Sequence, residues 1–227
     1  MPADVLTFSS SSSAAYRHKA PAYFSGARHD FVRRLPKDAT ASVLEVGCGT
    51  GATGALALAS GRAQRYTGIE LFESAAVEAR KVLTEVITGD VERLELDFGP
   101  AAFDALIMSE VLEHLVEPQR ALEKLLRSVR PGGLVLASSP NIAHWRVIRE
   151  LINGRFNLAD QGVFDRTHMR WFTPSTFAAM FHDAGLRIES LGPVTAFSER
   201  TQVISRLTKG RYDHLFMTQI QISARKI

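Results

Sequence analysis

Short apolar segments alternate with helical segments along most of this chain, and the first apolar segment runs into a cluster of glycines. Strands are expected at residues 42–46, 66–69, 85–88, 103–108, 134–138, 187–191 and 216–223. Helices are expected between them, at residues 27–35, 52–60, 74–83, 117–129, 142–151 and 174–184. Such an alternation needs crossover connections, and it therefore favours a parallel sheet covered by helices. The last segment alternates apolar and polar residues, as an antiparallel strand does.

The size and composition of the chain limit what it can be. With 227 residues, of which 45% are hydrophobic, it can bury one sizeable core. We expect one domain at residues 26–227, with an insertion at about 141–172, after a serine-containing segment at 1–25 that is flexible or partly ordered. Cys48 is the single cysteine, and neither a signal peptide nor an apolar run of about 18 residues is seen, so a cytoplasmic protein without a membrane span is expected. The charge of +3 includes no basic block, so we expect no nucleic-acid partner.

The glycine cluster lies where the first strand meets the first helix, at residues 43–51 (Val-Leu-Glu-Val-Gly-Cys-Gly-Thr-Gly). Glycine allows positive φ in a tight turn and lets a ligand approach the backbone, and the helix that follows offers N–H groups. Residues 49–54 also fit the dinucleotide pattern G-x-G-x-x-G. Glu70 ends the second strand, where a carboxylate can accept hydrogen bonds from ribose hydroxyls. The loop and Glu70 together predict an adenosine-type cofactor without deciding which one.

Acidic side chains beside the loop distinguish between the two candidate cofactors. Glu45, two residues before Gly47, suits a cofactor with a cationic amino-acid end and would repel a pyrophosphate. Asp90, at the end of the third strand, can accept a hydrogen bond from an adenine amino group, and the Val91 N–H can donate to the ring. Ser109 and the residues after it carry polar groups to the same edge of the sheet. These features favour S-adenosylmethionine (SAM) over a dinucleotide.

The chain resembles the class I SAM-dependent methyltransferases. The motifs that carry the resemblance occur in the family's order at residues 44–51, 68–70, 89–90, 103–104, 111–115 and 130–133. The resemblance implies an α/β Rossmann-like, doubly wound sheet of seven strands in the order 3-2-1-4-5-7-6, with the last strand antiparallel. It also implies SAM as cofactor, S-adenosylhomocysteine as product, and a cofactor site made of Glu45, Gly47, Gly49, Gly51, Glu70, Leu71, Asp90, Val91, Ser109 and Glu110. Glu45 stands where many relatives carry Asp.

Residues 141–172, after the fifth strand, resemble a narrower group of bacterial methyltransferases. The group carries a Pro-Asn-x-x-His-Trp segment, here at 140–145, and an Asp-Arg-Thr-His-x-Arg-Phe-Phe-Thr segment, here at 165–173 with Trp171 in place of the first Phe. Many members act in cell-surface polysaccharide or natural-product biosynthesis, sometimes fused to glycosyltransferases. The resemblance therefore suggests a small-molecule acceptor, either a sugar or glycoconjugate or a natural product, and a glycosyltransferase as an associated protein.

The polar and aromatic residues of the acceptor side each have a functional and a structural interpretation. His168 and His114 are candidate catalytic bases, because imidazole titrates near neutrality, but either can simply hydrogen-bond a nearby loop. The candidate acceptor-binding residues are His144, Trp145, Arg166, Arg170 and Trp171. The arginines can instead pair with Asp160 or Asp165, and the aromatic rings can pack as a lid. The histidines lack metal-ligand spacing along the chain, so no metal is expected.

Three other functions stay open at this point. An NAD-dependent oxidoreductase would share the glycine loop but would not need Glu45 or Asp90. A non-catalytic SAM-binding protein would keep the cofactor motifs and lose the polar acceptor side. A nucleic-acid methyltransferase would need a basic surface, and this chain also lacks an Asn/Asp-Pro-Pro-aromatic tetrapeptide after the fourth strand. The acceptor and the oligomeric state cannot be derived from the sequence.

Overall fold

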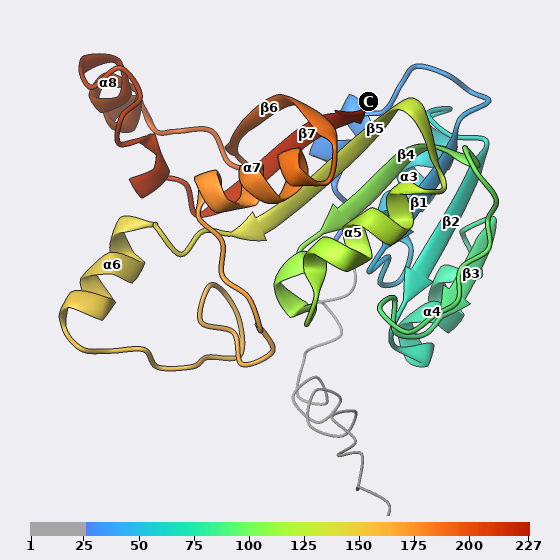
Figure 1. Ribbon diagram of the computed structural model, residues 1–227, viewed down its shortest axis with the longest axis horizontal. Helices are drawn as coiled ribbons and strands as arrows, with labels where there is room; N and C mark the ends of the chain where they lie inside the picture. The colour runs from blue at the N-terminus through green and yellow to red at the C-terminus, as the bar shows by residue number, and fades with distance from the viewer. Residues whose placement is uncertain (1–25) are drawn as a thin grey trace, which may run out of the picture.

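A computed structural model describes residues 26–227, so residues 1–25 lie outside the account that follows. Seven strands form one sheet in the order β3-β2-β1-β4-β5-β7-β6 (Figure 1). They are β1 (Ser42–Val46), β2 (Arg65–Glu70), β3 (Glu85–Thr88), β4 (Phe103–Ser109), β5 (Val129–Pro140), β6 (Leu186–Pro193) and β7 (Gln219–Lys226). The first five are parallel, and β7 is antiparallel to both β5 and β6. The predicted strand order and the antiparallel last strand are confirmed.

Helices cover both faces of the sheet. They are α2 (His29–Arg34), α3 (Ala52–Ala59), α4 (Glu73–Ala79), α5 (Pro118–Leu126), α6 (Trp145–Ile152), α7 (Pro174–Asp183) and α8 (Glu199–Leu207). Figure 1 shows α5 and α7 on the near face, whereas α6 and α8 lie beyond the ends of the central strands. None of the helices in residues 26–227 is both long enough and apolar enough to cross a bilayer.

Two hydrophobic clusters explain why the sheet is covered on both faces. In a strand, successive side chains point to opposite faces. Leu44 of β1 and Leu106 of β4 therefore belong to the cluster that includes α5 and α7, whereas their neighbours Val43 and Ile107 belong to the cluster that includes α2 and α3. A strand with both faces buried appears in the sequence as a continuous apolar run, which is what residues 103–108 show.

Two elements differ from the sequence expectations. The strand β5 begins at Val129, before the Pro-Gly-Gly segment at residues 131–133, although that segment was expected to precede the strand. The pairing of β4 with β5 is irregular between Phe103 and Ala105, so the proline and glycines are accommodated at a bulge. The helix α8 was not expected, and none of its residues is buried, because its apolar side chains Val203, Ile204 and Leu207 are exposed.

The segment between the fifth strand and α7 leaves and rejoins the sheet at one point. Asn141 and Phe172 pair as an isolated bridge, and the N–H of Ile142 donates to the Phe172 carbonyl at 3.0 Å. The buried Asn141 side chain also donates to the carbonyls of His214 and Met217. These bonds hold the base of the segment next to the start of β7, close to the carboxyl ends of the parallel strands.

Gly54 offers a test of how tightly α3 packs on the sheet. A Cβ at this position would lie 2.4 Å from Leu83 and 2.5 Å from the Tyr66 ring, both of which are buried. We expect Gly54→Ala to lower the free energy of unfolding by about 1–3 kcal/mol, despite the better helix propensity of alanine. Urea denaturation would measure the change. Gly192→Ala is the control, because a Cβ there meets nothing within 4 Å, and an equal loss in both variants would contradict the packing argument.

Candidate functional site

The glycine loop makes an open turn between β1 and α3. Gly47, Gly49 and Gly51 have φ values of +70°, +54° and +83°. This region is unfavourable for other residues. A Cβ on Gly47 would lie 2.7 Å from a Val111 methyl group, so glycine is also required by the close approach of the chain that follows β4. The three glycines thus leave a backbone-lined cradle at the carboxyl end of β1, which fits the close approach of a bound ligand.

Glu70 connects this loop to the end of β2. One of its carboxylate oxygens accepts a hydrogen bond from the Gly49 N–H at 2.8 Å, and the other accepts from the Phe72 N–H at 3.0 Å. Burial raises the pKa of Glu70, and the two backbone bonds oppose that rise. The carboxylate is therefore held in a fixed place by the loop itself.

Glu45 is the most buried acid of the loop. Its carboxylate accepts a hydrogen bond from the Tyr66 hydroxyl at 2.9 Å. Burial raises the pKa of Glu45 to about 7, the nearby charge of Glu70 adds to the rise, and Tyr66, Thr53 and Arg28 counteract it. Near neutral pH this acid is consequently poised between its neutral and ionised forms, and a cation arriving beside it would favour the ionised form.

The residues expected around an adenine lie at the ends of β2 and β3. Leu71, directly after Glu70, exposes 46% of its surface although it is a large apolar residue. Asp90 is partly exposed and accepts a hydrogen bond from the Glu92 N–H at 2.9 Å, while Val91 is buried. An accessible apolar side chain beside an accessible carboxylate suits an adenine ring, which needs a flat apolar contact and an acceptor for its amino group.

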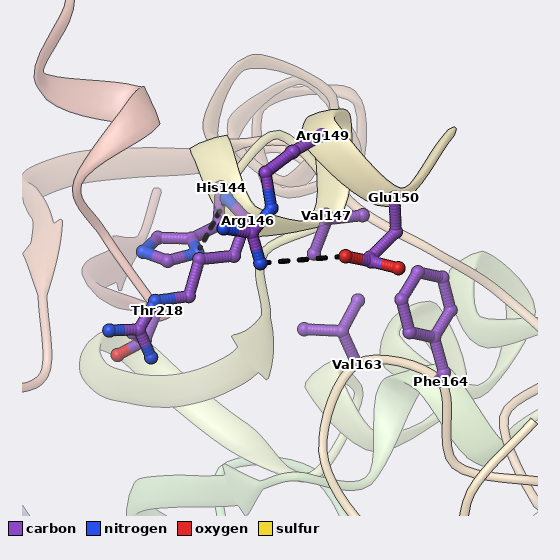
Figure 2. Close-up of a pocket in the computed structure, with 8 residues that line it drawn as sticks. All are labelled: His144, Arg146, Val147, Arg149, Glu150, Val163, Phe164 and Thr218. Atoms are coloured by element: carbon purple, nitrogen blue, oxygen red, sulfur yellow. Dashed lines mark hydrogen bonds and ion pairs between the residues drawn. The ribbon is translucent and has the colours of Figure 1, made fainter. Parts of the chain in front are cut away.

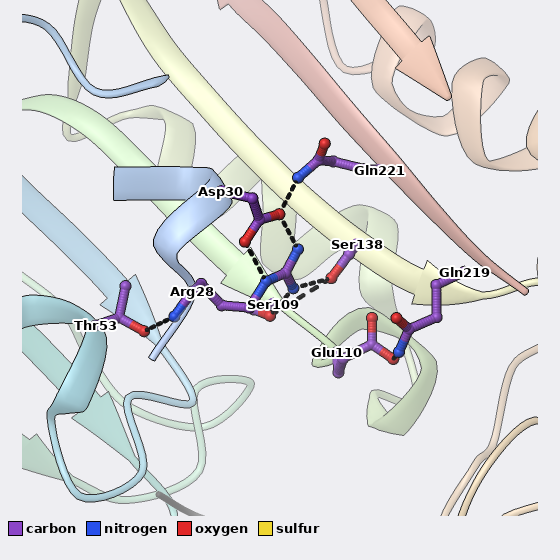
Figure 3. A network of polar contacts seen from close by, with 8 residues as sticks. All are labelled: Arg28, Asp30, Thr53, Ser109, Glu110, Ser138, Gln219 and Gln221. Atoms are coloured by element: carbon purple, nitrogen blue, oxygen red, sulfur yellow. Dashed lines mark hydrogen bonds and ion pairs between the residues drawn. The ribbon is translucent and has the colours of Figure 1, made fainter. Parts of the chain in front are cut away.

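Arg28 lies among the candidate site residues, and the sequence analysis did not single it out. Its guanidinium donates to the hydroxyl of Ser138 at 2.7 Å and to the hydroxyl of Ser109, and it forms an ion pair with Asp30 at 2.7 Å (Figure 3). Gln221 of β7 donates to the same Asp30 carboxylate. Arg28 thus brings a cation from the chain before α2 to the tips of β4 and β5. An isolated arginine in a segment without a motif gave no signal in the sequence.

Glu110 follows β4 in a conformation that is unusual for a residue with a side chain, with φ at +53°. Gln219 donates to one of its carboxylate oxygens at 3.0 Å, whereas the other oxygen is buried without a hydrogen-bond partner among the described residues. Burial raises the pKa of Glu110, and the neighbouring charge of Arg28 partly offsets this. Strained backbone of this kind is more frequent at functional sites than elsewhere.

His114 and His168, both predicted to be catalytic, lie side by side. Their ring centroids are 4.7 Å apart, in an edge-to-face arrangement. Nδ1 of His114 is 3.2 Å from the Thr167 carbonyl, and Nδ1 of His168 is 3.2 Å from the Val163 carbonyl. The 3-10 turn η2 (Leu112–His114) supplies the first histidine, and the segment from 141 to 172 supplies the second. Glu113 lies within reach of both rings and is only 1% exposed.

The other predicted acceptor residues of this segment have structural partners. Arg166 forms an exposed ion pair with Asp160 at 3.1 Å, which was the structural alternative for this residue. Arg170 donates to the carbonyls of Met169 and Val116. Trp171 donates through its indole N–H to the Val163 carbonyl at 3.0 Å and packs edge-to-face on Phe156. These contacts hold the loop that carries His168 in place.

His144 and Trp145 lie on a different side of the segment. His144 caps α6 by accepting a hydrogen bond from the Arg146 N–H at 3.4 Å, and its burial lowers its pKa. Figure 2 shows the open cavity beside it, of about 270 Å³, which is lined by His144, Arg146, Val147, Arg149, Glu150, Val163, Phe164 and Thr218. Trp145 is half-exposed, and the guanidinium groups of Arg146 and Arg149 each lie 5.4 Å from its ring centroid. The predicted acceptor residues are therefore divided between two places.

The raised pKa of Glu45 predicts a pH-dependent stability. The folded protein keeps this proton up to about pH 7, whereas the unfolded chain loses it near pH 4.5, so stability falls as the pH rises through this window. The loss amounts to about 3 kcal/mol at 1.36 kcal/mol per pH unit. The variant Glu45→Gln keeps an oxygen acceptor for Tyr66 but has no titrating carboxyl group, so it should not show this loss of stability. Urea denaturation at pH 5 and pH 8 should show wild type losing more stability than the variant, and parallel losses would contradict the assignment.

Comparisons with known proteins identify the family. Residues 16–191 match the family described as "Methyltransferase domain". A ubiquinone biosynthesis O-methyltransferase of Chromobacterium violaceum is 31% identical over 173 residues, covering 72% of each chain. The homologous protein of Azoarcus sp. is 30% identical over 169 residues, covering 67% of each chain.

Solved structures of two other proteins share the fold. A SAM-dependent methyltransferase from Archaeoglobus fulgidus has a TM-score of 0.62 at 21% identity, covering 90% of this chain and 96% of its own. One from Mesorhizobium loti has a TM-score of 0.61 at 18% identity, covering 88% and 98%. The family match, which decides for SAM and against NAD, agrees with the glycine cradle and the acids around it, and this chain belongs to the methyltransferase domain family as a SAM-dependent methyltransferase.

Proposed function

We propose that this enzyme methylates a hydroxyl group of a small-molecule acceptor. The observation that carries the proposal is the pair of histidines, His114 and His168, beside Glu113 at the carboxyl end of β4. A hydroxyl is a weak nucleophile until its proton is removed, so O-methylation benefits from such groups, whereas an amine with a free lone pair does not need them. The relatives named as O-methyltransferases support an oxygen acceptor, but their own acceptor is not assigned to this chain.

In this proposal the residues at the tips of β1 to β4 bind the cofactor. The cradle of Gly47, Gly49 and Gly51 surrounds the methionyl part, together with Glu45, Ser109 and Glu110. Glu70 accepts hydrogen bonds from the ribose, Leu71 packs on the adenine, and Asp90 and Val91 bond its edge. SAM, when bound, supplies a methyl group that is already activated on a cationic sulfur. Burial raises the pKa values of Glu45, Glu70 and Glu110. A cation bound beside these acids would favour their ionised forms and would be held by their charge.

Arg28 adds a cation to this otherwise acidic pocket. It already holds the hydroxyls of Ser109 and Ser138 and is partly exposed. A guanidinium in this position suits a carboxylate such as that of the methionyl group. We therefore assign Arg28 to the cofactor half of the site.

A sugar or glycoconjugate is the second candidate acceptor. The cavity beside α6 supports it, because Arg146, Arg149 and His144 line this cavity. The half-exposed Trp145 is not part of the lining, but its ring lies 5.4 Å from both guanidinium groups, and an aromatic face near charged groups suits a sugar. This alternative includes acceptors from surface polysaccharide biosynthesis, with a glycosyltransferase as an associated protein. It also includes a natural product as acceptor in place of the sugar. The buried, unpaired Cys48 is compatible with the cytoplasm, where such acceptors would be methylated.

An acceptor panel tests the proposed oxygen specificity. Purified protein with methyl-labelled SAM is expected to transfer label to hydroxyl compounds, with catechols and nucleotide-linked sugars as the first two groups, and mass spectrometry would locate the added methyl. Amines with the same carbon skeleton serve as matched acceptors. Label found on the amines and not on the hydroxyl compounds would overturn the proposal.

The division between cofactor and acceptor residues gives a second test. Glu70→Ala should weaken SAM binding at least tenfold, because hydrogen bonds to a charged acceptor contribute about 1.5–3 kcal/mol. Glu73→Ala is the matched control, since Glu73 lies on the surface in an ion pair with Arg80. His168→Ala should lower turnover while calorimetry shows SAM affinity nearly unchanged. Equal losses of SAM affinity in the Glu70 and His168 variants would contradict this division of roles.

A further inference from the structure

A buried carboxylate without a partner lies in the acceptor half of the site. Glu113 is 1% exposed, and neither of its carboxylate oxygens has a hydrogen-bond partner among residues 26–227. Isolated buried charges are costly, so such groups are paired or coordinate a metal. Nothing in the cofactor assignment above uses this side chain. It therefore needs a separate explanation.

The two histidines next to Glu113 are arranged as metal ligands are. A carbonyl oxygen can only accept a hydrogen bond, so the contacts to Thr167 and Val163 place the ring proton of each histidine on Nδ1. In the neutral ring the lone pair is then on Nε2. Histidines that bind metals almost always donate their other N–H to a carbonyl or carboxylate in this way, which fixes both the tautomer and the orientation of the ring.

The local charge also favours a cation. The carboxylates of Glu110 and Asp165 lie close enough to interact electrostatically with Glu113, so three acidic groups gather here. The nearby guanidinium groups are engaged elsewhere: Arg28 pairs with Asp30, and Arg170 donates to two backbone carbonyls. A cation bound beside Glu113 would be attracted by this concentration of acidic groups.

We propose that Glu113, His114 and His168 bind one divalent transition-metal ion, such as Zn²⁺, Mn²⁺ or Co²⁺. One ligand atom from each residue lies within 4.8 Å of the other two. Ligands about 2.1 Å from a tetrahedral metal lie about 3.4 Å apart, so binding requires each ligand atom to shift by up to about 0.8 Å. Two imidazoles and one carboxylate favour such ions over Mg²⁺, which prefers oxygen ligands. Three protein ligands also leave a coordination position open, as in catalytic metal sites.

The open position gives the metal a role in the reaction, and this part rests on the proposed function. The oxygen of the acceptor hydroxyl would coordinate the metal. Coordination would lower the pKa of the hydroxyl, and the hydroxyl proton would pass to solvent. The oxygen lone pair then forms the bond to the methyl carbon, while the carbon–sulfur bond breaks and its electron pair stays on the sulfur. The charge on the metal does not change, and no oxidant or reductant is needed.

Metal binding to the purified protein tests the site directly. After treatment with a chelator and dialysis, the protein is titrated with Co²⁺ and Mg²⁺ by calorimetry, and the Co²⁺ complex is examined by visible absorption. We expect one Co²⁺ per chain, at least tenfold weaker binding in Glu113→Gln and in His168→Ala, and much weaker binding of Mg²⁺. His182→Ala is the control, because this histidine is exposed on α7. Absence of Co²⁺ binding, or equal affinity in all variants, would overturn the site.

Activity assays separate this proposal from the proposed function. With an acceptor found in the panel, methyl transfer should be lost on chelation and restored by Zn²⁺, Mn²⁺ or Co²⁺, while SAM affinity stays unchanged. Full activity in the chelated protein would overturn the metal site and leave hydroxyl methylation intact, with the histidines as bases. Binding of Co²⁺ without methyl transfer to any hydroxyl compound would confirm the site and overturn the proposed function. Circular dichroism of each variant checks that it is folded.

Discussion

The burial of several carboxylates at one edge of the sheet is the constraint on which the rest of this site depends. Parallel strands end on the same side, so acids that are far apart in the sequence meet there. Burial raises the pKa values of Glu45, Glu70, Glu110 and Glu113. Such an arrangement lowers the stability of the protein near neutral pH. A cationic ligand recovers part of that free energy on binding, which explains why a pocket of this kind suits a sulfonium.

Much of the fold follows from patterns that are local in sequence. The apolar runs at 42–46 and 103–108 fill strands that are buried on both faces, and the glycines after the first run have the positive φ values that the turn requires. The order of the strands came from the family resemblance, and the structure confirms it. The helix α8 was not expected, and its apolar side chains Val203, Ile204 and Leu207 stay exposed in place of packing on the sheet.

The sequence pointed to candidate site residues most directly where a strand ends. Glu70 and Asp90 are recognisable because a strand pattern ends at them. Arg28 is not, since its role depends on how α2 packs against the sheet and on partners 81 and 110 positions away. The proposed metal site also depends on residues that are far apart in the sequence. The absence of ligand spacing along the chain was the basis for expecting no metal. His114 and His168 are 54 positions apart, and they meet because the Met169 and Arg170 N–H groups donate to the Glu113 carbonyl and the bonds around Asn141 hold the base of the inserted segment.

In the proposed arrangement, charge acts differently on the cofactor side and on the acceptor side of the site. The acids around the cofactor favour the cationic sulfonium over the neutral thioether that remains after transfer. They therefore stabilise the reactants and favour release of the product. However, stabilisation of the ground state does not accelerate the chemical step, because positive charge leaves the sulfur in the transition state. Under the proposed function the acceleration comes from aligning the two reactants and from the acceptor side, where Glu113, His114 and His168 would promote removal of the hydroxyl proton.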